Sequence, residues 1–189
     1  MKNVLGVILA FQLLLQSSVL YARGTVTNPA SFLQAPADQN SPRDAKETKD
    51  QLQDLACGPS DAHHSQRTDK DAQALPAQPA DKALIYVIRP THVGGLIQTK
   101  LAVDKKWVGV NRENNYFYIV LDPGPHYFCS QAENRSLLSL VVEAGKTYYL
   151  QQKITMGMMK ARNDLEVLNE EDGKKGLAKC KRSIFEEKN

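Results

Sequence analysis

Short blocks of apolar and β-branched residues recur along the second half of the chain, and turn-forming residues separate them. The blocks predict strands at residues 83–90, 96–104, 107–110, 115–122, 126–132, 136–143, 147–155 and 162–169. Glycine, proline, asparagine and aspartate between the blocks are typical of turns. Because short connections favour antiparallel neighbours, we expect an all-β fold, an antiparallel β-sandwich.

The block at 115–122 differs from the others because both of its faces are apolar. Side chains alternate across a strand, so residues 116, 118 and 120 share one face and residues 117, 119 and 121 share the other. A strand of this kind is covered on both sides. We therefore expect it in the centre of a sheet.

The C-terminal segment 170–185 has the pattern of a short helix. Asn169 is a candidate N-cap, acidic residues follow it, and basic residues lie near the end. Leu177, Cys180 and Ile184 recur at helical spacing and would pack on the sheet.

The first 22 residues have the three parts of a signal peptide. Lys2 precedes an apolar run that is too short for a bilayer span of about 20 residues, and Ala22 is a small residue at the expected cleavage point. We expect export to the periplasm or the medium, with the mature chain starting near Arg23 and no stable transmembrane span. A retained N-terminal anchor is the alternative.

Residues 23–81 have the composition of a mostly disordered linker. They are rich in Pro, Ala, Gln, Asp and Ser and contain one aromatic residue, Phe32. Such a segment buries too little apolar surface to offset chain entropy. Residues 44–56 are the one stretch here with a helical pattern, which leaves residues 82–185 as the predicted folded domain.

The charge of the chain excludes some classes of function. The 189 residues carry a net charge of +3, which argues against an obligate nucleic-acid binder, and mean hydropathy is negative. Residues 83–189 hold 16 Lys and Arg against 12 Asp and Glu, a basic excess that favours acidic partners. Phosphate-binding loops, nucleophile elbows and zinc-protease motifs are missing, and we expect no enzyme activity, catalytic residue, cofactor or metal.

The three cysteines are candidates for a disulfide, because export places them in an oxidising compartment. Pairing of Cys57 with Cys129 would fasten the end of the linker to the predicted domain. Pairing of Cys129 with Cys180, or no bridge at all, are the alternatives. A catalytic thiol is not expected, because His126 would point to the opposite face of the strand from Cys129.

Five segments in order resemble the bacterial family known as domain of unknown function 2846 (DUF2846). They are ALIYVIRP, LAVDKKWVGV, NNYFYIVLDPGPHYFCS, VEAGKTYYLQ and LEVLNEEDGKKGL, within residues 82–182. The upstream ACGPSD (56–61) is similar to the Cys-Gly-Pro that leads into a strand-like stretch in some exported members. The resemblance implies a β-sandwich-like domain of exported or lipoprotein type, with no activity to carry over. The hairpins also resemble PEGA-type and immunoglobulin-like modules.

Two hypotheses of function follow. The first is a non-enzymatic, exported module that binds an unknown envelope protein or polymer, or has a structural role there. The second is a small-ligand or carbohydrate-binding module with Trp107, Tyr116 and Tyr118 as candidate ligand-facing aromatics. If the central strand is covered on both faces, most of these aromatics belong to the core instead.

Overall fold

The computed structural model describes residues 42–188 apart from 61, 72–73 and 157–160. The predicted signal peptide (1–22) and residues 23–41 of the predicted linker lie outside the described residues. The elements in chain order are α1 (Pro42–Ala56), β1 (His63–Thr68), β2 (Ala83–Arg89), β3 (Thr99–Val103), β4 (Lys106–Asn111), β5 (Asn115–Leu121), β6 (Gly124–Gln131), β7 (Arg135–Val142), β8 (Thr147–Met156), β9 (Ala161–Leu168), α2 (Glu170–Leu177) and β10 (Lys181–Lys188).

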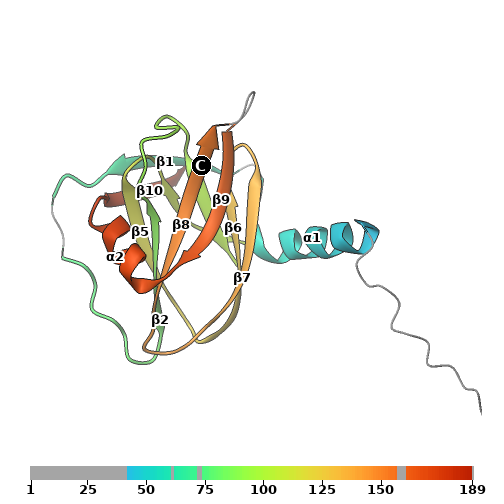
Figure 1. Cartoon of the computed structure of the whole chain (residues 1–189), viewed down its shortest axis with the longest axis horizontal. Coiled ribbons are helices and arrows are strands. Elements are labelled where there is room, and N and C mark those ends of the chain that lie inside the picture. Colours follow the sequence, from blue (N-terminus) through green and yellow to red (C-terminus); the bar gives the residue numbers. More distant parts are fainter. Residues whose placement is uncertain (1–41, 61, 72–73, 157–160, 189) are drawn as a thin grey trace, which may run out of the picture. The chain divides into compact units, whose positions relative to one another are not determined.

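The strands form two sheets (Figure 1). A six-stranded sheet has the order β1-β10-β5-β2-β8-β9, and a four-stranded sheet has the order β4-β3-β6-β7. The prediction of a purely antiparallel fold is wrong, because β2 pairs with β8 and β10 pairs with β5 in parallel. The links β2–β3, β4–β5, β5–β6 and β7–β8 each pass from one sheet to the other, so several short connections are not hairpins. A mainly β fold is confirmed, whereas its PEGA-like or immunoglobulin-like type stays a prediction.

The main hydrophobic core lies between the two sheets. Its buried members come from both sheets and include Ile85 and Val87 of β2, Leu101 of β3 and Phe128 of β6. All seven residues of β2 are buried, so β2 is the most completely covered strand among the described residues. The strand predicted to be central, β5, lies between β10 and β2 and is buried over its first half.

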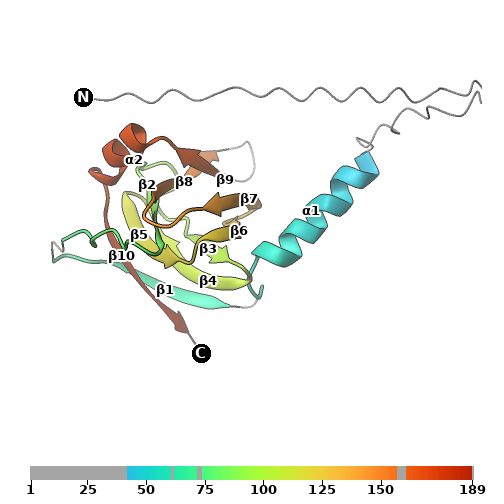
Figure 2. The same cartoon turned by 90° about the horizontal axis from the view of Figure 1, so that it is seen from below.

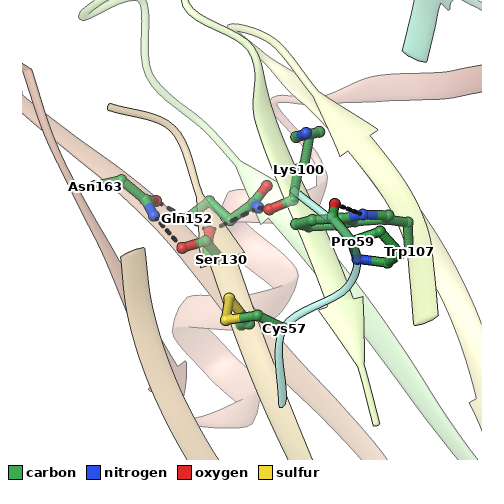
Figure 3. Close-up of a disulfide and its surroundings, with 8 residues drawn as sticks. Cys57, Pro59, Lys100, Trp107, Ser130, Gln152 and Asn163 are labelled. Carbon is green, nitrogen blue, oxygen red and sulfur yellow. Dashed lines mark hydrogen bonds between the residues drawn. A yellow bond between two sulfur atoms is a disulfide. The ribbon is translucent and has the colours of Figure 1, made fainter. Parts of the chain in front are cut away.

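Polar side chains fill one end of the space between the two sheets, and they form hydrogen bonds with one another. Gln152 of β8 is fully buried, and its Nε2 donates to Ser130 Oγ at 3.0 Å. Its Oε1 accepts from Thr99 Oγ1 at 3.0 Å and from Asn111 Nδ2 at 3.1 Å. Ser130 Oγ in turn donates to Asn163 Oδ1 (Figure 3). This network joins the sheets, because buried polar groups are stable only when they are hydrogen-bonded.

The C-terminal segment is a helix followed by a strand, so the prediction of one helix over 170–185 is wrong. Asn169 caps α2 as predicted, with its Oδ1 accepting from the Asp172 N–H at 2.9 Å. The helix ends at Leu177, and residues 183–188 of β10 pair with β1 (Figure 2). Residues 183–188 form a strand because they pair with the backbone of β1. The periodicity of the sequence gives no information on such pairing.

Part of the predicted linker has regular structure, as the helical pattern at 44–56 indicated for α1, whereas the strand at 63–68 was not expected. Residues 42–56 form α1, and the polar segment HHSQRT forms the edge strand β1. Gln66 Nε2 donates to Asn115 Oδ1 at 2.9 Å and to Ser183 Oγ at 3.0 Å, and these bonds fix β1 without an apolar side chain. In some exported DUF2846 members the Cys-Gly-Pro leads into a strand-like stretch, but the polar sequence here did not predict one.

Cys57 and Cys129 form a disulfide that fastens the end of α1 to β6, the pairing favoured from the sequence (Figure 3). Cys129 and Ala56, the residue before Cys57, are fully buried. Within the ranges described above, no helix is long and apolar enough to cross a membrane.

Candidate functional site

A cleft of about 620 Å³ opens where β2 ends and β5 begins. Its walls come from the end of β1, the loop after β2, the β4–β5 turn and the link between α2 and β10. Four exposed cations line it, and we call it the cationic cleft after them: Arg67, Arg112, Lys179 and Lys181. Chain segments far apart in sequence thus bring like charges together.

Among the residues that the structure describes, positive side chains outnumber negative ones in the lining of the cleft. Among the described residues that line the cleft, Glu113 is the one carboxylate, and its Oε2 lies 3.2 Å from His92 Nδ1. In the described part of the chain, none of the four cations forms a salt bridge. An arrangement of this kind attracts anions, because the positive charges reinforce one another in a concave surface.

A buried arginine holds the loop that forms one wall of the cleft. The Arg89 side chain is fully buried and donates to the carbonyl oxygens of Val93 at 3.1 Å and Gly94 at 2.6 Å, and also to that of Ile97. Burial lowers the pKa of Arg89 to about 10, against the opposing effect of Glu113. Arg89 therefore remains cationic at neutral pH and adds to the positive potential behind the cleft.

A second hollow, of about 450 Å³, lies between α2 and the outer face of the six-stranded sheet. We call it the tyrosine hollow, because Tyr86, Tyr116 and Tyr149 line it together with the apolar residues Leu75 and Leu177. The rings of Tyr86 and Tyr149 stack at 5.5 Å with an interplanar angle of 14°. Burial raises the pKa of all three phenols, so they stay neutral at physiological pH.

A smaller recess of about 230 Å³ adjoins the tyrosine hollow and shares Tyr116 and Cys180 with it. We call it the Asp69 recess. Asp69 is 8% exposed, and its Oδ1 accepts from the Asp71 N–H at 3.1 Å. Its Oδ2 is buried without a hydrogen-bond partner. Burial raises the pKa of the Cys180 thiol to about 11, which keeps it protonated and weakly nucleophilic.

Part of the domain that carries these surfaces is similar to known proteins. Residues 79–164 match the model of a family described as "Protein of unknown function (DUF2846)". This part of the chain is therefore similar to the DUF2846 family. An uncharacterized protein of Haemophilus influenzae is 28% identical over 101 residues, which are 53% of this chain and 60% of that protein. No solved structure matches the chain.

The DUF2846 match begins just before β2 and ends within β9, so it leaves out β1, α2 and β10. The tyrosines of the hollow fall inside the match, whereas Asp69 falls outside it. Of the four cations of the cleft, only Arg112 lies within the matched residues. Both surfaces are therefore completed by segments that flank the family's matched region.

The structure does not bring the three predicted ligand-facing aromatics together. Tyr116 and Tyr118 lie on the outer face of the six-stranded sheet, where Tyr116 is buried and Arg182 lies over the Tyr118 ring. Trp107 packs on the outer face of the four-stranded sheet beside the disulfide, and its Nε1 donates to the Pro59 carbonyl at 2.9 Å (Figure 3). The chain changes sheets between β4 and β5, which separates them.

The sequence predicts an excess of positive charge in the folded half but not which residues come together in the cleft. Arg67 lies in the predicted linker, as does Asp69 of the neighbouring recess, and Lys179 and Lys181 lie in the predicted helix. Their neighbourhood depends on β1 pairing with β10. The polar composition of both segments gave no signal of that pairing.

Proposed function

We propose that the protein is an exported, non-enzymatic β-sandwich module that binds an acidic partner in the cell envelope through the cationic cleft. The observation that carries this proposal is the convergence of Arg67, Arg112, Lys179 and Lys181 on one cleft without salt-bridge partners among the described residues. Basic side chains that face an open cleft recognise carboxylates or phosphates and steer them toward it.

Export is supported by the pattern of residues 1–22 and agrees with the Cys57–Cys129 disulfide, since such bonds persist in oxidising compartments. A non-enzymatic role is supported by the state of the free cysteine in the Asp69 recess. Burial keeps the Cys180 thiol protonated, which makes it a weak nucleophile.

Binding to fluorescently labelled polyglutamate tests the proposal. Arg112 of the β4–β5 turn and Lys179 of the α2–β10 link are exposed and line the cleft, so reversing both charges should disrupt the cleft without touching the core. We expect Arg112→Glu with Lys179→Glu to weaken binding at least about tenfold at about 50 mM salt, and to flatten the salt dependence of the dissociation constant.

A matched control separates a local site from net charge. Lys106 and Lys146 are exposed and lie outside the cleft, with Lys146 next to the start of β8 at the opposite end of the sheet. Lys106→Glu with Lys146→Glu makes the same change in net charge and should leave most of the affinity intact. Equal losses in both double variants would refute a site at the cleft.

A further inference from the structure

The tyrosine hollow and the Asp69 recess form a second site beside the cationic cleft, and the recess shares Lys181 with that cleft. The hollow and the recess share Tyr116 and Cys180 and together extend from α2 to the segment that follows β1. The hydroxyls of Tyr86, Tyr116 and Tyr149 have no hydrogen-bond partner among the described residues, although each could donate and accept. The three tyrosines are 4–7% exposed, and the small exposed parts of their side chains line the hollow together with Leu75 and Leu177.

Asp69 gives the site an acceptor that the protein leaves unused. Its side chain is more than nine-tenths buried, its backbone N–H donates to the Arg182 carbonyl at 2.8 Å, and its Oδ1 is satisfied. Oδ2 remains without a donor, although Lys70 and Lys181 line the same recess. Buried polar atoms without partners are rare, and one that lines a recess is a candidate for contact with a ligand.

The charges around the site select the kind of ligand. Lys70, Lys174, Lys181 and Arg182 disfavour an amine or a metal ion, and Asp69 and Asp71 disfavour an anion. A ligand without net charge suits both kinds of group, if it donates to a carboxylate and accepts from lysine, arginine or phenol. It must also present an apolar face to the lining of the hollow.

We propose that the tyrosine hollow and the Asp69 recess bind a neutral sugar residue. Sugar hydroxyls both donate and accept, and the C–H face of a pyranose ring can cover the apolar lining of the hollow, to which Leu75 and the exposed parts of the tyrosines contribute. One hydroxyl would donate to Asp69 Oδ2 while others contact the phenol groups. Volumes of about 450 and 230 Å³ are adjacent and fall together in the range of small-ligand sites, about 300–1,000 Å³.

The test is an NMR titration of the ¹⁵N-labelled protein with glucose, galactose, mannose and N-acetylglucosamine, each as the monosaccharide and as a linear tetrasaccharide. We expect one sugar to bind with a dissociation constant below about 10 mM and to shift the amides of Asp71, Tyr149 and Cys180. Tighter binding of the tetrasaccharide would assign a polymer as the source, and equal binding would assign a free sugar.

Two conservative variants test the residues. Asp69→Asn retains the Oδ1 contact but replaces the free acceptor by a donor, and we expect it to weaken sugar binding at least about tenfold. Its melting temperature should stay equal or rise, because the protein itself does not use Oδ2. Tyr116→Phe, which keeps the ring, should weaken binding several-fold without loss of stability.

The outcomes separate this inference from the proposed function. Arg112→Glu, in the cationic cleft, should leave sugar affinity unchanged while it weakens polyglutamate binding. The inference is overturned if none of the sugars shifts these amides, or if the sugar that does so binds Asp69→Asn and Tyr116→Phe as tightly as the unchanged protein.

Discussion

His126 links the β3–β4 turn to the start of β6 through both of its ring nitrogens. Nδ1 lies 2.6 Å from Asp104 Oδ2, and Nε2 lies 2.8 Å from the Asp122 carbonyl oxygen. Burial lowers the pKa of His126, but the hydrogen bonds and charges of Asp104 and Asp122 outweigh burial and raise it overall. The folded state therefore favours the protonated ring.

The pH dependence of stability should reveal this contact. A raised pKa in the folded state contributes stability that is fully present below the unfolded value of about 6.5 and disappears as pH rises through the folded value. We expect His126→Gln to destabilise the protein more at pH near 5.5 than at pH near 8. Urea unfolding of both proteins at the two pH values measures the difference, and a larger effect at the higher pH would contradict the assignment.

Single residues were predictable where their role depends on near neighbours in sequence. Asn169 could be recognised as a cap because its partner, Asp172, is three positions away. Asp69 could not, because its environment is set by Arg182, which comes from β10. In the sequence, Arg89 is only the last residue before the proline that ends a predicted strand. Its hydrogen bonds to the carbonyl oxygens of the following loop could be seen only in the structure.

At the level of elements, α2 shows how glycine permits close packing. Gly173 and Gly176 lower the intrinsic stability of a helix, yet a Cβ at Gly173 would lie 2.2 Å from Tyr149 Cγ, and one at Gly176 would lie 2.5 Å from Ile88 Cδ1. The helix therefore approaches the sheet more closely than alanine would allow, and it forms one wall of the tyrosine hollow.

Gly173→Ala should destabilise the protein although alanine is the better helix former. The clash involves Cβ and Cγ of the buried Tyr149, which cannot swing away as the end of a long side chain could. We expect a loss of about 1–3 kcal/mol in unfolding free energy, measured by urea titration. Lys175→Ala, on the exposed side of α2, serves as the control and should change stability by less than about 0.5 kcal/mol. A stabilised Gly173→Ala would contradict the close packing.

Strand positions were largely predictable, whereas strand partners were not. Each predicted strand from 83 to 169 corresponds to an element between β2 and β9, because alternation and turn residues are local signals. The parallel pair β2–β8 joins distant segments. The strands β1 and β10 were missed because β1 lacks apolar residues and the start of β10 continues a helical pattern.

At the scale of the molecule, the disulfide joins α1 to a domain that it otherwise contacts mainly through its last turn. Ala56 is fully buried, whereas Leu55 is 44% exposed. The Cys57–Cys129 bond spans 72 positions of sequence and encloses β1 to β5. It therefore restricts the unfolded chain over most of the domain's first half.

Removal of this bond should lower the free energy of unfolding by about 4 kcal/mol in the chain-entropy description. Cys57→Ala with Cys129→Ala, compared with the oxidised protein in urea, measures the loss. Reductant should destabilise the unchanged protein and have no effect on the double variant. A loss below about 1 kcal/mol would show that the contacts of Ala56 and Trp107 hold this region without the bond.

An acidic partner should bind where β1, the β4–β5 turn and the α2–β10 link meet. Chemical-shift mapping of the ¹⁵N-labelled protein with polyglutamate locates the binding surface. We expect the amides of Arg67, Asn114, Lys179 and Lys181 to shift together and to return when salt is raised, while the amide of Lys146 stays in place. Shifts spread over all exposed lysines, or centred away from the cleft, would contradict this expectation.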